Sequence, residues 1–158
     1  MGREKNKHNA ERCLENGIRF DSKMEALYYS EVVKPLMDSG EIVSCELQKP
    51  YILQEGFERN GKQVRPITYK ADFCLEYKDG RIVVIDIKGF ADAQALIKRK
   101  MFWHRYPDID YQWITRSVKD GGWRDYDYVK RKRSERANKK AAVKPKKVDI
   151  FDEEDSLF

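Results

Sequence analysis

An aspartate interrupts the most apolar run of the sequence. Asp86 follows residues 82–85, which are all Ile or Val, and Lys88 comes two positions later. A carboxylate in a buried strand is unfavourable unless it is paired or binds a cation. The pattern D/E-x-K occurs three times in the chain, and only this copy lies in a run that predicts a central strand. Asp86 and Lys88 are therefore the first candidates for chemistry.

The turn before this strand predicts a second carboxylate beside Asp86. Residues 78–80, Lys-Asp-Gly, suit a three-residue hairpin loop that pairs Tyr77 with Arg81. On that register Asp72 faces Asp86, with Cβ atoms about 4.5–5.5 Å apart. A two-residue turn would place the two aspartates on opposite faces. We prefer the longer loop because it collects the apolar side chains on one face, namely Phe73, Leu75, Tyr77, Val83, Ile85 and Ile87.

Two neighbouring carboxylates repel each other unless they share a proton or a cation. Hard oxygen ligands with open positions suit Mg²⁺ or Mn²⁺, which keep waters and accept phosphate oxygens. Such a metal can lower the pKa of a bound water and stabilise charge on a phosphate. Lys88 could orient that water or stabilise the pentavalent transition state. The alternative is a buried ion pair of Asp86 and Lys88 beside a solvated Asp72.

These residues need a sheet with helices around it. Ser22 and Glu25 have capping-box spacing at the start of a helix expected to run to about residue 39, which Pro35 should kink or shorten. Asn60-Gly61 marks a turn. The expected order is α-β-β-β-α-β, an α/β fold with a central mixed sheet flanked by helices. After the first helix, the expected elements are strands at 42–48 (continuing at 51–53), 67–77 and 81–87, a helix at 91–106 and a strand at 111–115.

With these elements in place, the chain resembles the PD-(D/E)xK nucleases. The resemblance is carried by FDSKMEALYY (residues 20–29), YKADF (69–73) and VIDIKG (84–89), and it covers about residues 18–118. It is closest to small phage-encoded endonucleases of the junction-resolving endonuclease I type. It implies a restriction-endonuclease-like αβββαβ core and metal-dependent hydrolysis of DNA phosphodiester bonds.

The resemblance also implies a role for each site residue. Asp72 and Asp86 would be metal ligands together with the carbonyl of Ile87, Lys88 would be the catalytic lysine, and Glu25 an acid supplied by the helix. The implied cofactor is Mg²⁺ or Mn²⁺.

Three details of the match leave alternatives open. Ala71 stands where the family name has Pro, and Asp86 stands where Glu is common, although the motif allows either. Glu25 could instead be only the capping-box glutamate, reaching back to the N–H of Ser22.

Charge is distributed unevenly along the 158 residues. The chain is 37% charged with a net charge of +5. Residues 1–127 carry about +1, residues 128–147 carry ten Lys/Arg and one acid, and residues 148–158 carry five acids and no base. This predicts a polar N-terminal segment (1–19), a nuclease-like domain (20–127), a basic arm (128–147) and an acidic tip (148–158). The arm could be helical to about Val143, before Pro145.

The basic side chains are candidates for contact with DNA phosphates, because clustered Lys and Arg displace counterions from nucleic acid. The alternative for the arm is a solvated tail, and for the second helix a solvent-exposed face. The candidates are Lys70, Lys98, Lys100, Lys130, Arg131, Lys132 and Arg133.

The acidic tip is a candidate for binding another protein. Its last three residues, Ser156, Leu157 and Phe158, resemble the end of the short peptides that bind bacterial sliding clamps. The acidic lead-in with a terminal Phe also resembles the tips of bacterial single-stranded-DNA-binding proteins. The alternative is a tail that aids solubility or masks the arm.

Taken together, these patterns predict a magnesium-dependent endodeoxyribonuclease of phage or prophage origin. Its expected substrate is branched DNA such as a Holliday junction, which would favour a homodimer with two active sites. The alternative is an inactive nuclease fold that acts as a DNA-binding or replication-partner adaptor. The sequence has no apolar run of transmembrane length and no apolar N-terminal segment. Its three cysteines lack C-x-x-C spacing, so we expect a reduced, cytoplasmic setting in a bacterial host cell.

Overall fold

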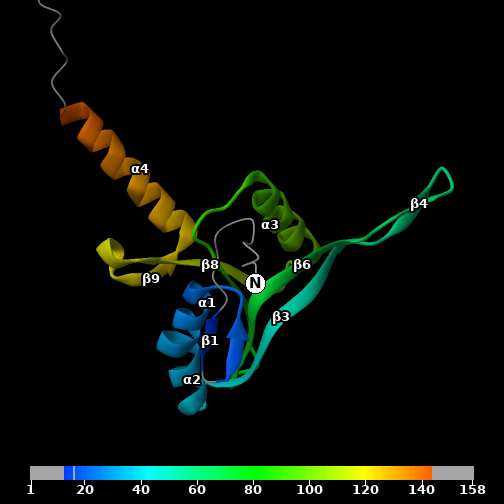
Figure 1. Ribbon diagram of the computed structural model, residues 1–158, viewed down its shortest axis with the longest axis horizontal. Helices are drawn as coiled ribbons and strands as arrows, with labels where there is room; N and C mark the ends of the chain where they lie inside the picture. Colours follow the sequence, from blue (N-terminus) through cyan, green and yellow to red (C-terminus); the bar gives the residue numbers. More distant parts are fainter. Residues whose placement is uncertain (1–12, 16, 144–158) are drawn as a thin grey trace, which may run out of the picture.

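The computed structural model describes residues 13–15 and 17–143. A five-stranded sheet of order β3-β6-β7-β8-β9 lies at its centre, with β7 and β8 parallel and the other neighbours antiparallel. Helices flank it (Figure 1), so the expected α/β class with a mixed sheet is confirmed. The elements are β1 (Cys13–Glu15), β2 (Ile18–Phe20), α1 (Lys23–Tyr28), the π-helix η1 (Tyr29–Val33), α2 (Lys34–Asp38), β3 (Ile42–Gln54), β4 (Phe57–Arg59), β5 (Lys62–Val64), β6 (Ile67–Tyr77), β7 (Ile82–Ile87), α3 (Ala93–Arg105), β8 (Asp110–Ser117), the 3₁₀ helix η2 (Val118–Asp120), β9 (Gly122–Asp125) and α4 (Tyr126–Val143).

The first helix accommodates its proline by widening one turn. The N–H of Lys34 donates to the carbonyl of Tyr29, five residues back, within η1. Pro35 then follows at the start of α2. In a regular α-helix its ring would clash with the carbonyl four residues earlier. The π turn lets the chain continue as a helix to Asp38, so the expected disturbance is local widening of the helix.

The hairpin between β6 and β7 has the expected three-residue loop. Phe73 pairs with Ile85 and Leu75 with Val83, which is the register that the sequence predicts. The N–H of Gly80 donates to the carbonyl of Tyr77 at 2.8 Å, and Gly80 has a φ of 84°. This left-handed conformation closes a type I turn without splaying the strands. This register ends one residue short of Asp72 and Asp86.

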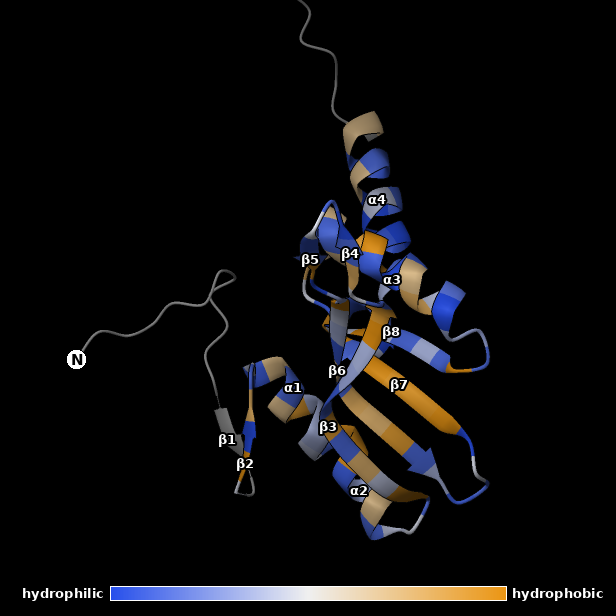
Figure 2. Ribbon diagram, turned by 90° about the vertical axis from the view of Figure 1, so that its right-hand side faces the viewer, coloured by the Kyte–Doolittle hydropathy of each residue, from blue (hydrophilic) through white to orange (hydrophobic). Residues whose placement is uncertain are grey.

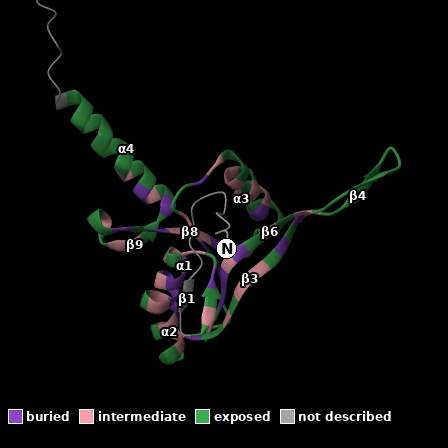
Figure 3. Cartoon of the chain, in the orientation of Figure 1, coloured by how far each residue is buried: buried purple, intermediate pink, exposed green. Residues whose placement is uncertain are grey.

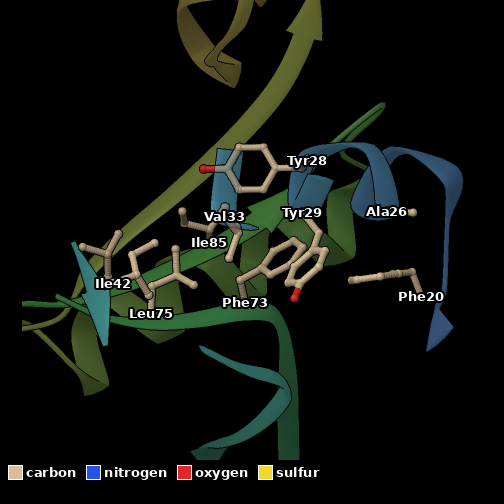
Figure 4. Packing of buried hydrophobic residues seen from close by; sticks show 10 residues of the cluster. Phe20, Ala26, Tyr28, Tyr29, Val33, Ile42, Phe73, Leu75 and Ile85 are labelled. Atoms are coloured by element: carbon tan, nitrogen blue, oxygen red, sulfur yellow. The ribbon is translucent and has the colours of Figure 1, made fainter. Parts of the chain in front are cut away.

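Two hydrophobic clusters hold the sheet from opposite sides. Figure 4 shows the first, in which the helix residues Tyr28, Tyr29 and Val33 pack on Phe73 and Ile85. The second lies under α3, where buried rings surround a fully buried Phe102. Figure 2 shows how hydrophobic β7 is, as expected for a strand covered on both faces. The second cluster includes Tyr51, Val84, Phe102, Tyr111 and Trp113.

Several elements were not expected from the sequence. The expected strands at 42–48 and 51–53 form one strand, β3, in which Pro50 is tolerated because β3 is at the sheet edge. The turn at Asn60-Gly61 is confirmed, but short strands β4 and β5 flank it. Strands β1, β2 and β9 are also additional, and β1–β2 lies in the segment expected only to be polar.

Helix α4 extends the fold away from its body (Figure 1), and it reaches Val143 as expected. Among the described residues, no helix is both long enough and apolar enough to cross a membrane.

Replacing Gly80 by Ala should reduce the free energy of unfolding by about 1 kcal/mol, because a Cβ disfavours the left-handed conformation. No atom lies within 4 Å of the added Cβ, so the loss of stability reports the backbone conformation of residue 80 and not a steric clash. Urea denaturation measures it. Gly89→Ala is the matched control, because Gly89 also has open space and no left-handed φ. Equal stability of the two variants would contradict the loop geometry.

Candidate active site

The site forms where β6 and β7 separate. Their paired residues run from Glu76–Ile82 to Phe73–Ile85. Beyond that point, the N–H of Ile87 donates to Oδ2 of Asp72 at 2.7 Å. A side-chain carboxylate thus satisfies a main-chain donor at the end of the strand pair. Asp72 is thereby fixed between the two strands.

Asp86 lies beside it and is almost fully buried, with 3% of its surface exposed. Its Oδ2 forms an ion pair with the ammonium group of Lys88. Lys88 is held by its own N–H, which donates to the carbonyl of Ile114 at 2.8 Å, and its Nζ lies 5.3 Å from the Trp113 ring centroid. The ion pair of the alternative interpretation is present, and beside it the half-buried Asp72 accepts hydrogen bonds from Gln48 and from the N–H of Ile87.

Glu25 is buried at the start of α1, where it reaches back as the capping-box spacing predicts, but to the N–H of Asp21 and the Ser22 hydroxyl instead of the N–H of Ser22. Its Oε1 accepts from the Ser22 hydroxyl at 2.7 Å, and its Oε2 accepts from the N–H of Asp21 at 3.2 Å. Its own N–H donates to Ser22 Oγ at 3.2 Å. Burial raises its pKa against the lowering effect of these hydrogen bonds, and the charge of Asp86 raises it further. Glu25 therefore caps the helix and also adds negative charge near the aspartates.

The electrostatics of the site favour a cation. Burial raises the pKa of Asp72 well above its ordinary value, and the charges of Asp86 and Glu25 add to this. The N–H of Ile87 and the charge of Lys88 oppose the increase. Three carboxylates therefore face one ammonium group, and a further positive charge would relieve their repulsion.

The donor set suits a cation that keeps most of its waters. Among the described residues, no group of three His, Cys, Asp or Glu side chains is arranged to hold a metal ion. Protein ligands would be the two aspartates and a main-chain carbonyl such as that of Ile87, while Glu25 is directed at Ser22 and Asp21. A few hard oxygen ligands completed by water fit Mg²⁺.

Comparison with known families assigns the chain to one of them. Residues 5–122 match the family model described as protein of unknown function (DUF1064). The chain belongs to the DUF1064 family. No curated protein and no solved structure gives a match. In this DUF1064 protein the matched segment contains the whole carboxylate site, while α4 lies beyond it.

Gln48 is a site residue that sequence reasoning missed. This edge-strand residue of the DUF1064 protein lies between Leu47 and Lys49, which pair with Phe73 and Ala71. Its Nε2 donates to Oδ1 of Asp72 at 3.3 Å, and its φ is 54°. A left-handed glutamine is strained, and such strain is common at functional sites. Only the long-range pairing of β3 with β6 reveals this contact.

Two tyrosines below Asp86 were also missed. The hydroxyl of Tyr111 accepts from Trp113 Nε1 at 2.5 Å, and the hydroxyl of Tyr69 is buried. Burial and the charge of Asp86 raise the pKa of both tyrosines. Both hydroxyls therefore stay protonated at neutral pH.

The basic candidates on the sheet and on α3 differ in their surroundings. Lys70 and Lys100 are exposed, whereas Lys98 donates to the carbonyl of Thr68 at 2.9 Å. Arg99, between them, is not available to phosphate. Its guanidinium lies 4.0 Å from the Trp113 centroid and pairs with Asp127 at 2.8 Å. It fastens α3 to the first turn of α4.

The basic arm is the exposed part of α4 (Figure 3). Tyr126 and Val129 anchor its first turns in the body. Lys130, Arg131 and Arg133 are exposed, and Lys132 is half-buried and pairs with Glu135 at 3.1 Å. Residues 144–147 of the arm and the tip residues Ser156, Leu157 and Phe158 lie outside the described residues.

The strain at Gln48 predicts an order of stability between two variants. Gln48→Ala and Gln48→Gly both remove the amide, but only glycine adopts the left-handed conformation without strain. We expect Gln48→Gly to be about 1 kcal/mol more stable than Gln48→Ala in chemical denaturation. If Gln48→Ala is the more stable variant, residue 48 does not have the described backbone.

Proposed function

We propose that this protein is a divalent-metal-dependent DNA endonuclease of the PD-(D/E)xK type. The observation that carries the proposal is the Asp72 carboxylate, fixed at the separation of β6 and β7 beside a buried Asp86–Lys88 pair. Burial and neighbouring charge raise the pKa of Asp72, which makes the metal-free site electrostatically unfavourable. Carboxylates with raised pKa values are common in sites that bind metal and phosphate, whereas a purely structural ion pair does not need a second carboxylate beside it.

In this proposal Mg²⁺ is held by Asp72, Asp86 and the carbonyl of Ile87. The bound metal supplies positive charge to the scissile phosphate and lowers the pKa of a water molecule. Gln48 holds one oxygen of Asp72 and the N–H of Ile87 holds the other, so the carboxylate is oriented before substrate arrives.

Lys88 has two roles in the proposed reaction. Its ammonium group offsets the charge of Asp86 in the free protein. When a phosphate enters, the same group can stabilise the charge that develops on the phosphate oxygens. Its side chain is 20% exposed, so it can reach both the buried aspartate and a bound substrate.

The DNA contacts would come from basic side chains around the site. Helix α4 has 18 residues, a length of about 27 Å, so it can follow phosphates well beyond the scissile bond. Its exposed cations would contribute through counterion release. Lys70, Lys98 and Lys100 would contact phosphates nearer the sheet. A four-way junction is the proposed substrate, with a homodimer supplying two sites.

A second candidate is a DNA-binding or replication-partner adaptor without catalysis. It is favoured by the closed Asp86–Lys88 ion pair, which already satisfies the buried charge without a metal. Docking of Ser156, Leu157 and Phe158 on a sliding clamp remains a prediction for either function.

A DNA cleavage assay distinguishes the nuclease from the adaptor. Wild-type protein should cut a labelled four-way junction with Mg²⁺ or Mn²⁺, and Asp86→Asn should reduce the rate at least ~100-fold because an essential ligand is lost. Linear, nicked, flapped and single-stranded DNA complete the panel. Asp38→Asn is the matched control, since Asp38 is exposed and forms an ion pair with Lys34 on its own helix. It should cut like wild type.

Absence of cleavage on every substrate with either metal would contradict the proposal. So would equal cleavage by Asp86→Asn, since the activity would then come from another source. DNA binding without cleavage would support the adaptor.

A further inference from the structure

The β4–β5 hairpin extends far from the body without packing on it (Figure 1). All residues from 55 to 66 are exposed. Residues 55–56 and 65–66 connect its strands to β3 and β6, and the Asn60-Gly61 turn has φ values of 51° and 71°. These values are those of a type I′ turn, which matches the twist of a two-residue hairpin. Local sequence therefore encodes a defined ribbon.

The two faces of this ribbon differ in charge. Arg59 pairs across the strands with Lys62, and Phe57 with Val64, so these four side chains share one face. The pair between them, Glu58 and Gln63, lies on the opposite face, where Gln63 Nε2 donates to Glu58 Oε2 at 3.4 Å. Phe57 is 43% exposed and Val64 36%. One face therefore presents two cations and an apolar pair, and the other holds the acid.

We propose that the Arg59–Lys62 face of this hairpin binds in a groove of duplex DNA next to the cleavage site. The proposal rests on the proposed function and adds a substrate contact to it. The major groove of B-DNA admits a two-stranded ribbon. The cations would contact phosphates at the groove edge, and the Phe57–Val64 pair would lie against sugars or base edges.

The position of the hairpin fits a substrate contact. Strand β6 leads from the hairpin to Asp72. The chain from Gly61 to Asp72 spans at most about 36 Å at ~3.3 Å per residue. One turn of DNA is about 34 Å. A hairpin in the groove would therefore lie within about one helical turn of the phosphate at the site.

A second copy of the chain is a poorer occupant. Two such faces would oppose Arg59 and Lys62 to the same cations. A ribbon of three residue pairs also offers far less than the ~800 Å² per partner of a standard interface. The negative charge of DNA complements Arg59 and Lys62. A DNA complex also needs less buried area from any single element of the protein than a dimer interface does.

The test is DNA binding by the double variant Arg59→Ala/Lys62→Ala in the Asp86→Asn background. Affinity for a fluorescent duplex and four-way junction is measured by anisotropy over a range of salt concentrations with EDTA present. Losing two phosphate contacts should weaken binding roughly tenfold or more and reduce the slope of log K against log salt by about 1.8. Thermal denaturation should show unchanged stability, since both side chains are exposed.

Glu58→Ala/Gln63→Ala, on the opposite face, is the matched control and should bind at least as tightly as the parent. An unchanged slope and affinity in the cation variant would overturn the proposal. So would a loss of dimer mass in light scattering with unchanged DNA binding, because the hairpin would then contact a second copy. If the slope falls while wild-type protein cuts nothing, the hairpin contact holds and the nuclease proposal fails.

Discussion

The hydrogen bond from the N–H of Ile87 to the Asp72 carboxylate is the contact on which the site depends. It forms where β6 and β7 stop pairing with each other. Without the separation, the side chain could not reach between the strands, and without the carboxylate the N–H would lose its acceptor. The hairpin register and the two clusters on either face of the sheet fix both strands on either side of this point.

The residues around this contact destabilise the folded state locally. Asp72, Asp86 and Glu25 are close enough for their charges to raise pKa values, and Lys88 offsets only part of that charge. Gln48 adds a strained backbone at the same place. Charge repulsion and backbone strain at one end of an otherwise well-packed sheet are typical of a functional site.

The sequence predicted the parts of the fold that local rules determine. The three-residue loop and the alternation of apolar residues were enough to predict the register of β6 and β7 as far as Phe73 and Ile85, next to the two aspartates. The capping box at Ser22 and Glu25 and the helical arm before Pro145 follow from local spacing in the same way.

Long-range contacts could not be predicted in this way. Gln48 reaches Asp72 only because β3 pairs with β6, and nothing in its neighbourhood indicates a left-handed residue. Arg99 resembles Lys98 and Lys100 in the sequence, but packing on Trp113 gives it a structural role. The strands β4 and β5 are too short and polar to be recognised by alternation.

The central claim is that the carboxylates form a cation site. It is tested most directly by the thermal unfolding midpoint as a function of Mn²⁺ concentration. The account predicts that Mn²⁺ raises the midpoint of wild-type protein in a saturable way, because the ion binds only the folded state. It predicts that Asp72→Asn, which loses one repelling charge, unfolds at a higher temperature than wild type in EDTA and no longer responds to Mn²⁺. An equal response of both proteins, or no response of the wild type, would contradict it.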